Sequence, residues 1–288
     1  MRFAVLGSPI AHSKSPAMHQ AAFRALGLAH TYEAIDCDVA QFEEHVRSLK
    51  HGKFQGFNVT VPHKLRALPF ADEIDASAKH VGAANTLVRE ESGKVIAHNT
   101  DVGALVVELE TLAGSRDRFR GRTAVVVGTG GAARAAIAAC GHLGLRRVVI
   151  LARAPDSLAR DAEHILRDSS SHPSGLATTS IVARALERGP FANDDVGVVV
   201  QATTCGMTGG PDGSIVANAI DWAALPKSAV ALDAVYAPRE TEFVRAARAA
   251  GLACANGLGM LARQGALAFE LWLKIPAPFD VMRAAIDG

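Results

Sequence analysis

Short apolar segments alternate with longer segments of mixed polarity along most of the chain. In the second half, four apolar segments are rich in β-branched residues, as expected of strands that are buried on both faces of a sheet. These segments are residues 123–127, 147–151, 196–201 and 229–235, and the segments that can form helices are residues 132–142, 155–166 and 240–249. Residues 168–175 are rich in Ser, Pro and Gly and predict a loop. This alternation predicts an α/β fold with a parallel sheet.

The first half shows the same alternation with shorter elements. Strands are predicted at residues 3–6, 31–35 and 54–61, and helices at residues 15–26, 39–49 and 101–112. Ser15 is the predicted N-cap of the first helix, with Pro16 at its first helical position. Residues 85–89 and 94–97 flank a turn that contains Gly93, which predicts a hairpin. A last helix is predicted at residues 259–273. The polar stretch 114–121 is the candidate passage between two subdomains, although we expect the helix before it to bridge them.

Length and composition narrow the class of protein. The 288 residues suffice for about two domains, because domains typically contain roughly 100–200 residues. A formal net charge of +1 gives no reason to expect a nucleic acid or a membrane surface as a partner. The four cysteines lie far apart, without a CxxC pair or a Cys/His cluster at metal-ligand spacing, so we expect free thiols and no metal site. The chain has neither a signal-peptide pattern at its N-terminus nor an apolar run of roughly 18 residues, so we expect a cytoplasmic protein.

A glycine-rich loop follows the apolar strand at residues 123–127. The loop starts Gly-Thr-Gly-Gly-Ala-Ala, which fits the pattern GxGxxG/A, and an alanine-rich helical segment follows it. Glycine lets the backbone turn tightly and approach a pyrophosphate closely, and the free N–H groups of the helix start favour its negative charge. The context predicts a dinucleotide-binding site formed by Gly128, Thr129, Gly130, Gly131 and Ala132.

The end of the next predicted strand distinguishes between two cofactors. NAD sites usually place an acidic residue there to bind the ribose 2′-hydroxyl. This chain has Arg153 between two alanines. A guanidinium group can make charge-assisted, bidentate hydrogen bonds to a 2′-phosphate, so Arg153 predicts NADP.

Polar side chains gather at three places in the first 101 residues. Ser13, Lys14 and Ser15 come just before a predicted helix, whose N-terminus favours an anion such as a carboxylate. The other two clusters are residues 58–64 and residues 85–86 with 98–101. Their hydroxyl and amide groups favour a polyhydroxylated ligand, because each ligand hydroxyl needs a hydrogen-bond partner once it is buried.

Within these clusters, Lys64 and Asp101 are the pair that acid–base chemistry would use. When a ketone accepts a hydride, an alkoxide develops, and a lysine can donate the proton that it needs. A neighbouring carboxylate can orient the lysine and hold its charge. Without the surrounding motifs, a surface ion pair would be the simpler interpretation of these two residues.

Eight segments of the chain resemble, in the same order, the signatures of the shikimate dehydrogenase family. They are residues 7–19, 58–64, 82–86, 99–101, 128–132, 201–207, 233–238 and 257–264, and the resemblance covers essentially the whole chain. It implies the reversible reduction of 3-dehydroshikimate to shikimate with NADPH, a step of chorismate and aromatic amino-acid biosynthesis. It also implies two domains with the active site between them. Residues 1–102 with 257–288 would form an α/β substrate-binding and catalytic domain, and residues 103–256 a Rossmann-type NADP-binding domain.

The resemblance also implies roles for individual residues. Lys64 and Asp101 would be the catalytic pair, and Ser13 and Ser15 would bind the substrate carboxylate. The other expected substrate contacts, to ring hydroxyls or the carboxylate, are Thr60, Asn85, Tyr236 and Gln264. The expected NADP contacts are Gly128, Thr129, Gly130, Gly131, Ala132 and Arg153, with the backbone near Ala234 and Gly257 beside the nicotinamide.

The chain departs from the family pattern at the adenosine end. The family often has Asn-Arg-Thr where Ala152, Arg153 and Ala154 stand, and a second basic residue where Ser157 stands. Gln20 and Gln201 each replace a common Asn, and neither is expected to take part in the chemistry.

Three alternatives remain at this point. A quinate/shikimate dehydrogenase that uses NAD is the first, although some relatives that accept quinate have Thr where Ser15 stands. The second is a non-catalytic nucleotide-sensing module, which would have no need of both Lys64 and Asp101. The third, a folate-linked dehydrogenase, would leave Ser13 and Ser15 without a purpose. The expected assembly is a monomer or a homodimer.

Overall fold

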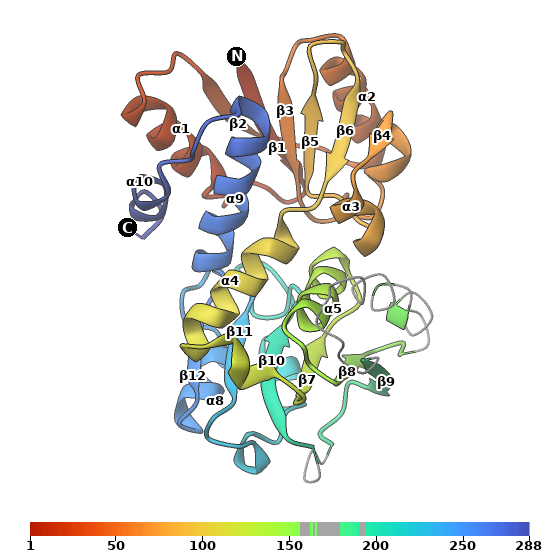
Figure 1. Ribbon diagram of the computed structural model, residues 1–288, viewed down its shortest axis with the longest axis vertical. Coiled ribbons are helices and arrows are strands. Elements are labelled where there is room, and N and C mark those ends of the chain that lie inside the picture. Colours follow the sequence, from red (N-terminus) through yellow and green to blue (C-terminus); the bar gives the residue numbers. More distant parts are fainter. Residues whose placement is uncertain (156–161, 164, 166–178, 190–193, 288) are drawn as a thin grey trace. The chain divides into compact units, whose positions relative to one another are not determined.

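The chain divides into two compact units. The computed structural model describes residues 1–155, 162–163, 165, 179–189 and 194–287. The first unit comprises Met1–Ala104 with Met260–Gly288, and the second comprises Leu105–Gly259. The chain passes from one unit to the other within helices α4 (Asp101–Ala113) and α9 (Leu258–Leu273) (Figure 1). The boundary therefore lies in the helix before residues 114–121, which was expected to bridge the two subdomains, and not in that polar stretch itself.

The first unit contains a mixed six-stranded sheet with the strand order β2-β1-β3-β5-β6-β4. Its strands are β1 (Arg2–Gly7), β2 (Thr31–Asp36), β3 (Gly56–Val59), β4 (Glu73–Ile74), β5 (Thr86–Arg89) and β6 (Val95–His98). Strand β1 pairs in parallel with β2 and β3, whereas β5 runs antiparallel to β3 and β6. The predicted hairpin is confirmed, with Gly93 in its turn at a φ of 88°, a backbone conformation that favours glycine.

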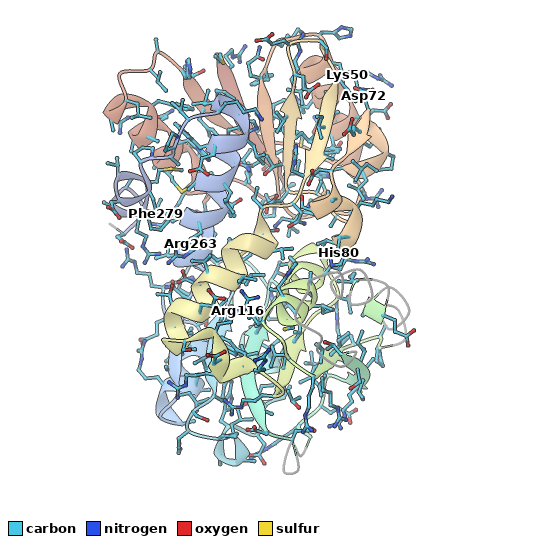
Figure 2. All side chains as sticks on the ribbon, viewed as in Figure 1. Lys50, Asp72, His80, Arg116, Arg263 and Phe279 are labelled. Atoms are coloured by element: carbon cyan, nitrogen blue, oxygen red, sulfur yellow. The ribbon has the colours of Figure 1, made fainter. Side chains whose placement is uncertain are left out.

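The helices of the first unit are α1 (Ser15–Ala25), α2 (Val39–Lys50), α3 (Ala76–Val81) and α10 (Phe279–Ala284), with parts of α4 and α9 and a 3₁₀ turn at Leu68–Phe70. Helix α2 begins with a capping box, in which Asp38 and Gln41 satisfy each other's backbone amides. Its apolar face packs into a core that includes Phe42, Leu49 and Phe57. Near the C-terminus, the guanidinium of Arg263 lies 5.1 Å from the ring centre of Phe279 (Figure 2).

The start of α1 differs from the expectation. Its N-cap is Lys14, so Ser15 is already helical and does not cap the helix. The hydroxyl of Ser13 accepts a hydrogen bond from the amide of Ser15, at 3.3 Å. Ser13 thus satisfies an amide at the helix start, and the helix can begin one residue before Pro16.

The second unit contains a fully parallel six-stranded sheet. Its order is β12-β11-β10-β7-β8-β9. The strands are β7 (Thr123–Val127), β8 (Arg147–Ala152), β9 (Ser180–Ala185), β10 (Val196–Gln201), β11 (Val230–Asp233) and β12 (Ala253–Ala255). Counted along the unit, this is the order 3-2-1-4-5-6 of dinucleotide-binding sheets, in which ligands bind where the order reverses, between β7 and β10. The α/β fold class is confirmed.

The described helices of the second unit are α5 (Gly131–His142), α7 (Ser214–Ala217) and α8 (Glu242–Ala249), with 3₁₀ turns at Arg116–Phe119 and Trp222–Ala224. Residues from α8, such as Phe243 and Ala247, pack on Val199 and Ala231 of the sheet. The predicted helix at residues 155–166 lies largely, and the predicted loop at residues 168–175 entirely, outside the described residues. Within the described part of the chain, no helix combines the length and the apolar character that crossing a membrane requires.

Candidate active site

Lys64 and Asp101 form an ion pair in the first unit. Lys64 Nζ lies 2.7 Å from Asp101 Oδ2, and the side chains are only 15% and 2% exposed. Lys64 follows β3 across a turn, and Asp101 is the first residue of α4. A carboxylate is stabilised at this end of a helix because the peptide dipoles point their positive end toward it. The two residues predicted to work together are thus in contact, in a partly buried setting rather than as a surface pair.

Asn85 holds the second oxygen of the Asp101 carboxylate. Its Nδ2 donates to Asp101 Oδ1 at 2.8 Å and to Thr100 Oγ1 at 2.9 Å, and its Oδ1 accepts from the backbone N–H of Thr100 at 2.8 Å. The backbone of Asn85 is itself held, since its N–H donates to the carbonyl of His98. Asp101 therefore accepts hydrogen bonds on both carboxylate oxygens.

Gln264 joins the same cluster from helix α9. Its Oε1 accepts from Asn85 Nδ2 at 3.3 Å, and its Nε2 donates to the carbonyl of Leu261 at 2.9 Å. Adjacent Gly265 allows the close approach of the helix, because a Cβ there would lie 2.1 Å from the terminal methyl of Met18. The structure thus brings together four predicted residues, Lys64, Asp101, Asn85 and Gln264.

The remaining predicted residues of the first unit lie at two separate positions in its fold. Ser13 and Ser15 are neighbours at the start of α1, and Ser15 is buried. Thr60 directly follows β3, half-buried, and its methyl group packs against Gly7, where a Cβ would come within 2.4 Å. The shared role of these three residues with the Lys64–Asp101 pair stays a prediction.

The glycine-rich loop of the second unit joins β7 to α5 as predicted. Gly128 has a φ of 117°, and a Cβ there would lie 2.9 Å from the methyl of Thr203. Gly130 is the N-cap of α5, and a Cβ there would meet nothing within 4 Å. Open space beside the backbone, followed by a 12-residue helix without an acid in its first turn, fits a dinucleotide pyrophosphate.

Ala133 takes the third position of the GxGxxG/A pattern and is fully buried. A residue without a long side chain at this position lets the helix pack closely on the sheet. Among the residues of the loop and of β8 that are predicted to contact NADP, Gly130 and Arg153 are exposed. Gly130 lies in the loop, and Arg153 lies at the end of β8. The strand that ends at Ala152 has no acid at its end, which fits a 2′-phosphate better than a free 2′-hydroxyl.

The buried carboxylate of Asp233 holds the loops after β10 and β11. Asp233 accepts from Gln201 Nε2 at 3.1 Å, from the amide of Val235 at 2.9 Å and from Thr241 Oγ1 at 2.5 Å. Burial raises the pKa of Asp233 to about 6. Gln201 also donates to the carbonyl of Cys205 at 3.0 Å, so it ties the two loops together.

Asp233 lies beside the residues that are predicted to contact the nicotinamide. Ala234 follows Asp233 directly, and a Cβ on Gly257 would lie 2.2 Å from the Ala234 carbonyl oxygen. The amide of Gly257 donates to the carbonyl of Val235 at 3.0 Å. Tyr236, predicted to contact substrate, stands half-buried in the same loop. Gly257 is thus required by a close backbone approach.

Several residues of these hydrogen-bond networks were not predicted from the sequence. Tyr32 was predicted only as a strand residue, yet its hydroxyl donates to Asn58 Oδ1 at 2.7 Å. Asp233 and Thr241 were not singled out, and Gln201 was expected to have no role in the chemistry. The available signal was a polar residue inside or at the end of an otherwise apolar strand.

These features define a class of protein: a two-unit α/β protein with a Rossmann-type unit and a separate unit that carries a buried Lys–Asp pair. The chain belongs to the shikimate dehydrogenase family. Residues 5–87 match the model of the shikimate dehydrogenase substrate binding domain, and residues 257–286 match that of the shikimate 5′-dehydrogenase C-terminal domain.

Individual relatives agree with this assignment over nearly the whole length. The NADP(+) shikimate dehydrogenase of Symbiobacterium thermophilum is 37% identical over 99% of this chain and 94% of the relative. A crystal structure of the shikimate 5-dehydrogenase of Thermus thermophilus, in complex with NADP(H) and shikimate, is 33% identical with a TM-score of 0.77, covering 99% of this chain and 98% of that one. A quinate dehydrogenase of Corynebacterium glutamicum in complex with NAD is 28% identical with a TM-score of 0.82, over 99% and 98%.

Proposed function

We propose that this chain catalyses the NADP-dependent, reversible reduction of 3-dehydroshikimate to shikimate, a step of chorismate biosynthesis. The observation that carries the proposal is the partly buried Lys64–Asp101 pair, held by Asn85 in the unit whose residues match the family's substrate-binding model. The curated relative and the Thermus thermophilus structure support NADP and shikimate as the ligands.

In this proposal Lys64 donates the proton that the developing alkoxide needs, and Asp101 orients and balances the ammonium group. Bound NADPH supplies the hydride. The short distance between Lys64 Nζ and Asp101 Oδ2 supports this pairing. The burial of the pair, with Lys64 15% and Asp101 2% exposed, limits the access of water to it.

Substrate binding is assigned to the hydroxyl and amide groups of the first unit. Ser13 and Ser15 bind the carboxylate at the start of α1, where helix N–H groups favour an anion. Thr60, Asn85 and Gln264, with Tyr236 from the second unit, contact the carboxylate or the ring hydroxyls. The contact of Asn85 with Gln264 supports a common role for these two.

Cofactor binding is assigned to the second unit. The loop from Gly128 through Thr129, Gly130 and Gly131 to Ala132 holds the pyrophosphate, Arg153 holds the 2′-phosphate, and the backbone of Ala234 and Gly257 lies beside the nicotinamide. The open space at Gly130 and the acid-free helix start support the first assignment. The exposed position of Arg153 at the end of β8 supports the second.

Each predicted domain binds one ligand: residues 1–102 with 257–288 bind the substrate, and residues 103–256 bind NADP. We place the protein in the cytoplasm as a monomer or homodimer. The biosynthetic role of its relatives supports the first statement. Gel filtration with light scattering would test the second.

The experiment that tests the function is a spectrophotometric assay of nicotinamide reduction with shikimate or quinate, each with NADP or NAD. Fast reduction of NADP by shikimate alone is the expected result. Comparable rates with quinate or NAD would favour a quinate/shikimate dehydrogenase, the activity named for the Corynebacterium glutamicum structure. Absence of activity in all four combinations would contradict the proposal and favour a non-catalytic nucleotide-binding module.

A further inference from the structure

A chain of buried hydrogen bonds leads to Asp101 from the edge strand β2 of the sheet. Tyr32 Oη donates to Asn58 Oδ1 at 2.7 Å, and Asn58 Nδ2 donates to Thr86 Oγ1 at 3.2 Å. Thr86 Oγ1 donates to Asn85 Oδ1 at 3.1 Å, and Asn85 Nδ2 donates to Asp101 Oδ1. All five side chains are at most 4% exposed. The chain therefore runs through the protein without access to water.

Backbone groups fix the direction of this chain at both amides. The N–H of Thr100 can only donate, so the group of Asn85 that faces it at 2.8 Å must be the carbonyl oxygen. The backbone carbonyl of Asn85 can only accept, so the group of Asn58 that faces it at 3.3 Å must be the NH₂. The hydroxyl of Tyr32 must then donate to Asn58, and Asn85 must present its NH₂ to Asp101.

The orientation of Asn85 restricts where a proton can lie on Asp101. Oδ1 accepts from an N–H donor, so the lone pair of Oδ1 that faces Asn85 carries no proton. A proton that passes between Lys64 and Asp101 would therefore lie on Oδ2, the oxygen that faces Lys64 Nζ. Asp101 Oδ2 thus holds the ammonium group of Lys64 from one side.

We propose that Tyr32 and Thr86 are positioning residues, which act through Asn58 and Asn85 to keep Asp101 an acceptor on Oδ1 and its exchangeable proton next to Lys64. The proposal rests on the proposed function, because it presumes that the Lys64–Asp101 pair carries the proton transfer. Neither residue has a described hydrogen bond to the pair: the hydroxyls of Thr86 and Tyr32 reach it through the two amides, and Thr86 Oγ1 also lies 3.5 Å from Thr100 Oγ1.

The experiment compares Thr86→Val, which removes the hydroxyl, with Thr86→Ser, which keeps it. We expect Thr86→Val to lower kcat about tenfold, as expected for the loss of one ordinary hydrogen bond in the transition state, and to leave the KM for NADPH within about twofold. Thr86→Ser is expected to restore kcat to within about threefold of the wild type. Equal losses in both variants would overturn the proposal, since the hydroxyl would then be irrelevant.

Trp272→Phe is the matched control for a loss of stability. Trp272 Nε1 donates to the carbonyl of Leu87, one residue after Thr86 on β5, at 3.1 Å, and its ring, which lies 6.1 Å from the ring of Tyr32, is replaced by another aromatic ring in the variant. We expect this variant to melt at a lower temperature with an unchanged kcat. A Thr86→Val enzyme that behaves in the same way would overturn the proposal and leave Thr86 a structural residue.

Tyr32→Phe keeps the test decisive if Thr86→Val does not fold. The variant retains the ring, which stacks on His19 with centres 4.3 Å apart, and removes only the hydroxyl that donates to Asn58. A fall in kcat at constant KM for NADPH supports the proposal, and wild-type kcat in this variant overturns it. A wild-type enzyme without shikimate activity would instead contradict the proposed function, so the two failures are distinguishable.

Discussion

The candidate site of the first unit is formed by side chains, whereas that of the second unit is formed by backbone. In the first unit, the side chains of Lys64, Asp101 and Asn85 are held by mutual hydrogen bonds inside a polar network. In the second unit, the proposed site consists of backbone: Gly130 leaves open space at the start of α5, and Gly128 has a φ of 117°. The two candidate sites should therefore be sensitive to different kinds of substitution.

In the first unit, removal of one polar atom should disturb the site while the fold tolerates it. In the second unit, addition of one carbon should disturb the site.

Lys64→Ala should lower kcat by about 10²–10⁴-fold, because it removes the proposed proton donor. Circular dichroism should show an intact fold. Lys50→Ala is the matched control: Lys50 also pairs with an aspartate, Asp72, at 2.6 Å, but both side chains are 38% exposed on the outer part of the first unit (Figure 2). Steady-state kinetics should show no change for Lys50→Ala, and unchanged turnover in Lys64→Ala would remove Lys64 from the mechanism.

Gly130→Ala should raise the KM for NADPH by about 10–100-fold, because the new methyl group would occupy the space that a pyrophosphate needs for charge-assisted hydrogen bonds. The variant should be as stable as the wild type or slightly more so, since Gly130 has a φ of −77° that alanine adopts. Gly128→Ala should instead lower the melting temperature, because of its positive φ and the nearby Thr203. Thermal melts and NADPH titrations would be measured together; an unaltered KM in Gly130→Ala speaks against the loop as the pyrophosphate site.

Arg153→Ala should raise the KM for NADPH about tenfold and leave the KM for NADH nearly unchanged, because only NADPH carries the 2′-phosphate. Arg116, which pairs with Glu110 at 3.5 Å elsewhere in the second unit, offers a control arginine (Figure 2). Arg116→Ala should change neither constant. Equal effects of Arg153→Ala on both cofactors would rule out the 2′-phosphate assignment.

Buried titratable groups should give the two units opposite responses to pH. Burial lowers the pKa of His19 in the first unit to about 3 and raises the pKa of Asp233 in the second unit to about 6. The stability that His19 contributes is present above its unfolded pKa of 6.5 and is lost as the pH falls toward 3. The stability that Asp233 contributes is present below 3.8 and is lost as the pH rises through 6. Each group should change the free energy of unfolding by at most about 1.4 kcal/mol per pH unit within its window.

Denaturant unfolding at several pH values would measure these slopes in the wild type, His19→Phe and Asp233→Asn. The two tryptophans report separately, because Trp272 lies in the first unit and Trp222 in the second. His19→Phe should flatten the loss of stability toward acid pH that Trp272 reports, and Asp233→Asn should flatten the fall in stability from pH 4 to 6 that Trp222 reports. Slopes that do not respond to either substitution would contradict these two assignments.

Much of the second unit could be predicted from the sequence, because buried parallel strands are marked by continuous apolar runs. Strands β7 and β10 have the predicted bounds. Strand β9 was not predicted, since it is a half-exposed strand with polar residues such as Ser180 and Arg184. Strands β4 and β12 have two and three residues and are too short to show a periodic pattern.

The candidate site was predicted in part for the same physical reason. Lys64, Asp101 and Asn85 lie in motifs whose polar residues stand out against apolar surroundings. The part played by Tyr32 depends on the alignment of three strands, because β1 pairs with β2 and with β3 in parallel and so brings Tyr32 within reach of Asn58. Such long-range register is not visible in a local pattern.

The most direct test of the account is a calorimetric titration of shikimate and of NADPH, separately, into the wild type, Ser15→Ala and Gly130→Ala. The account predicts a crossed result: Ser15→Ala weakens shikimate binding and leaves the Kd for NADPH unchanged, whereas Gly130→Ala weakens NADPH binding and leaves the Kd for shikimate unchanged. If each variant weakened both ligands equally, or if neither variant altered its own ligand, the division of the site between a side-chain unit and a backbone unit would be contradicted.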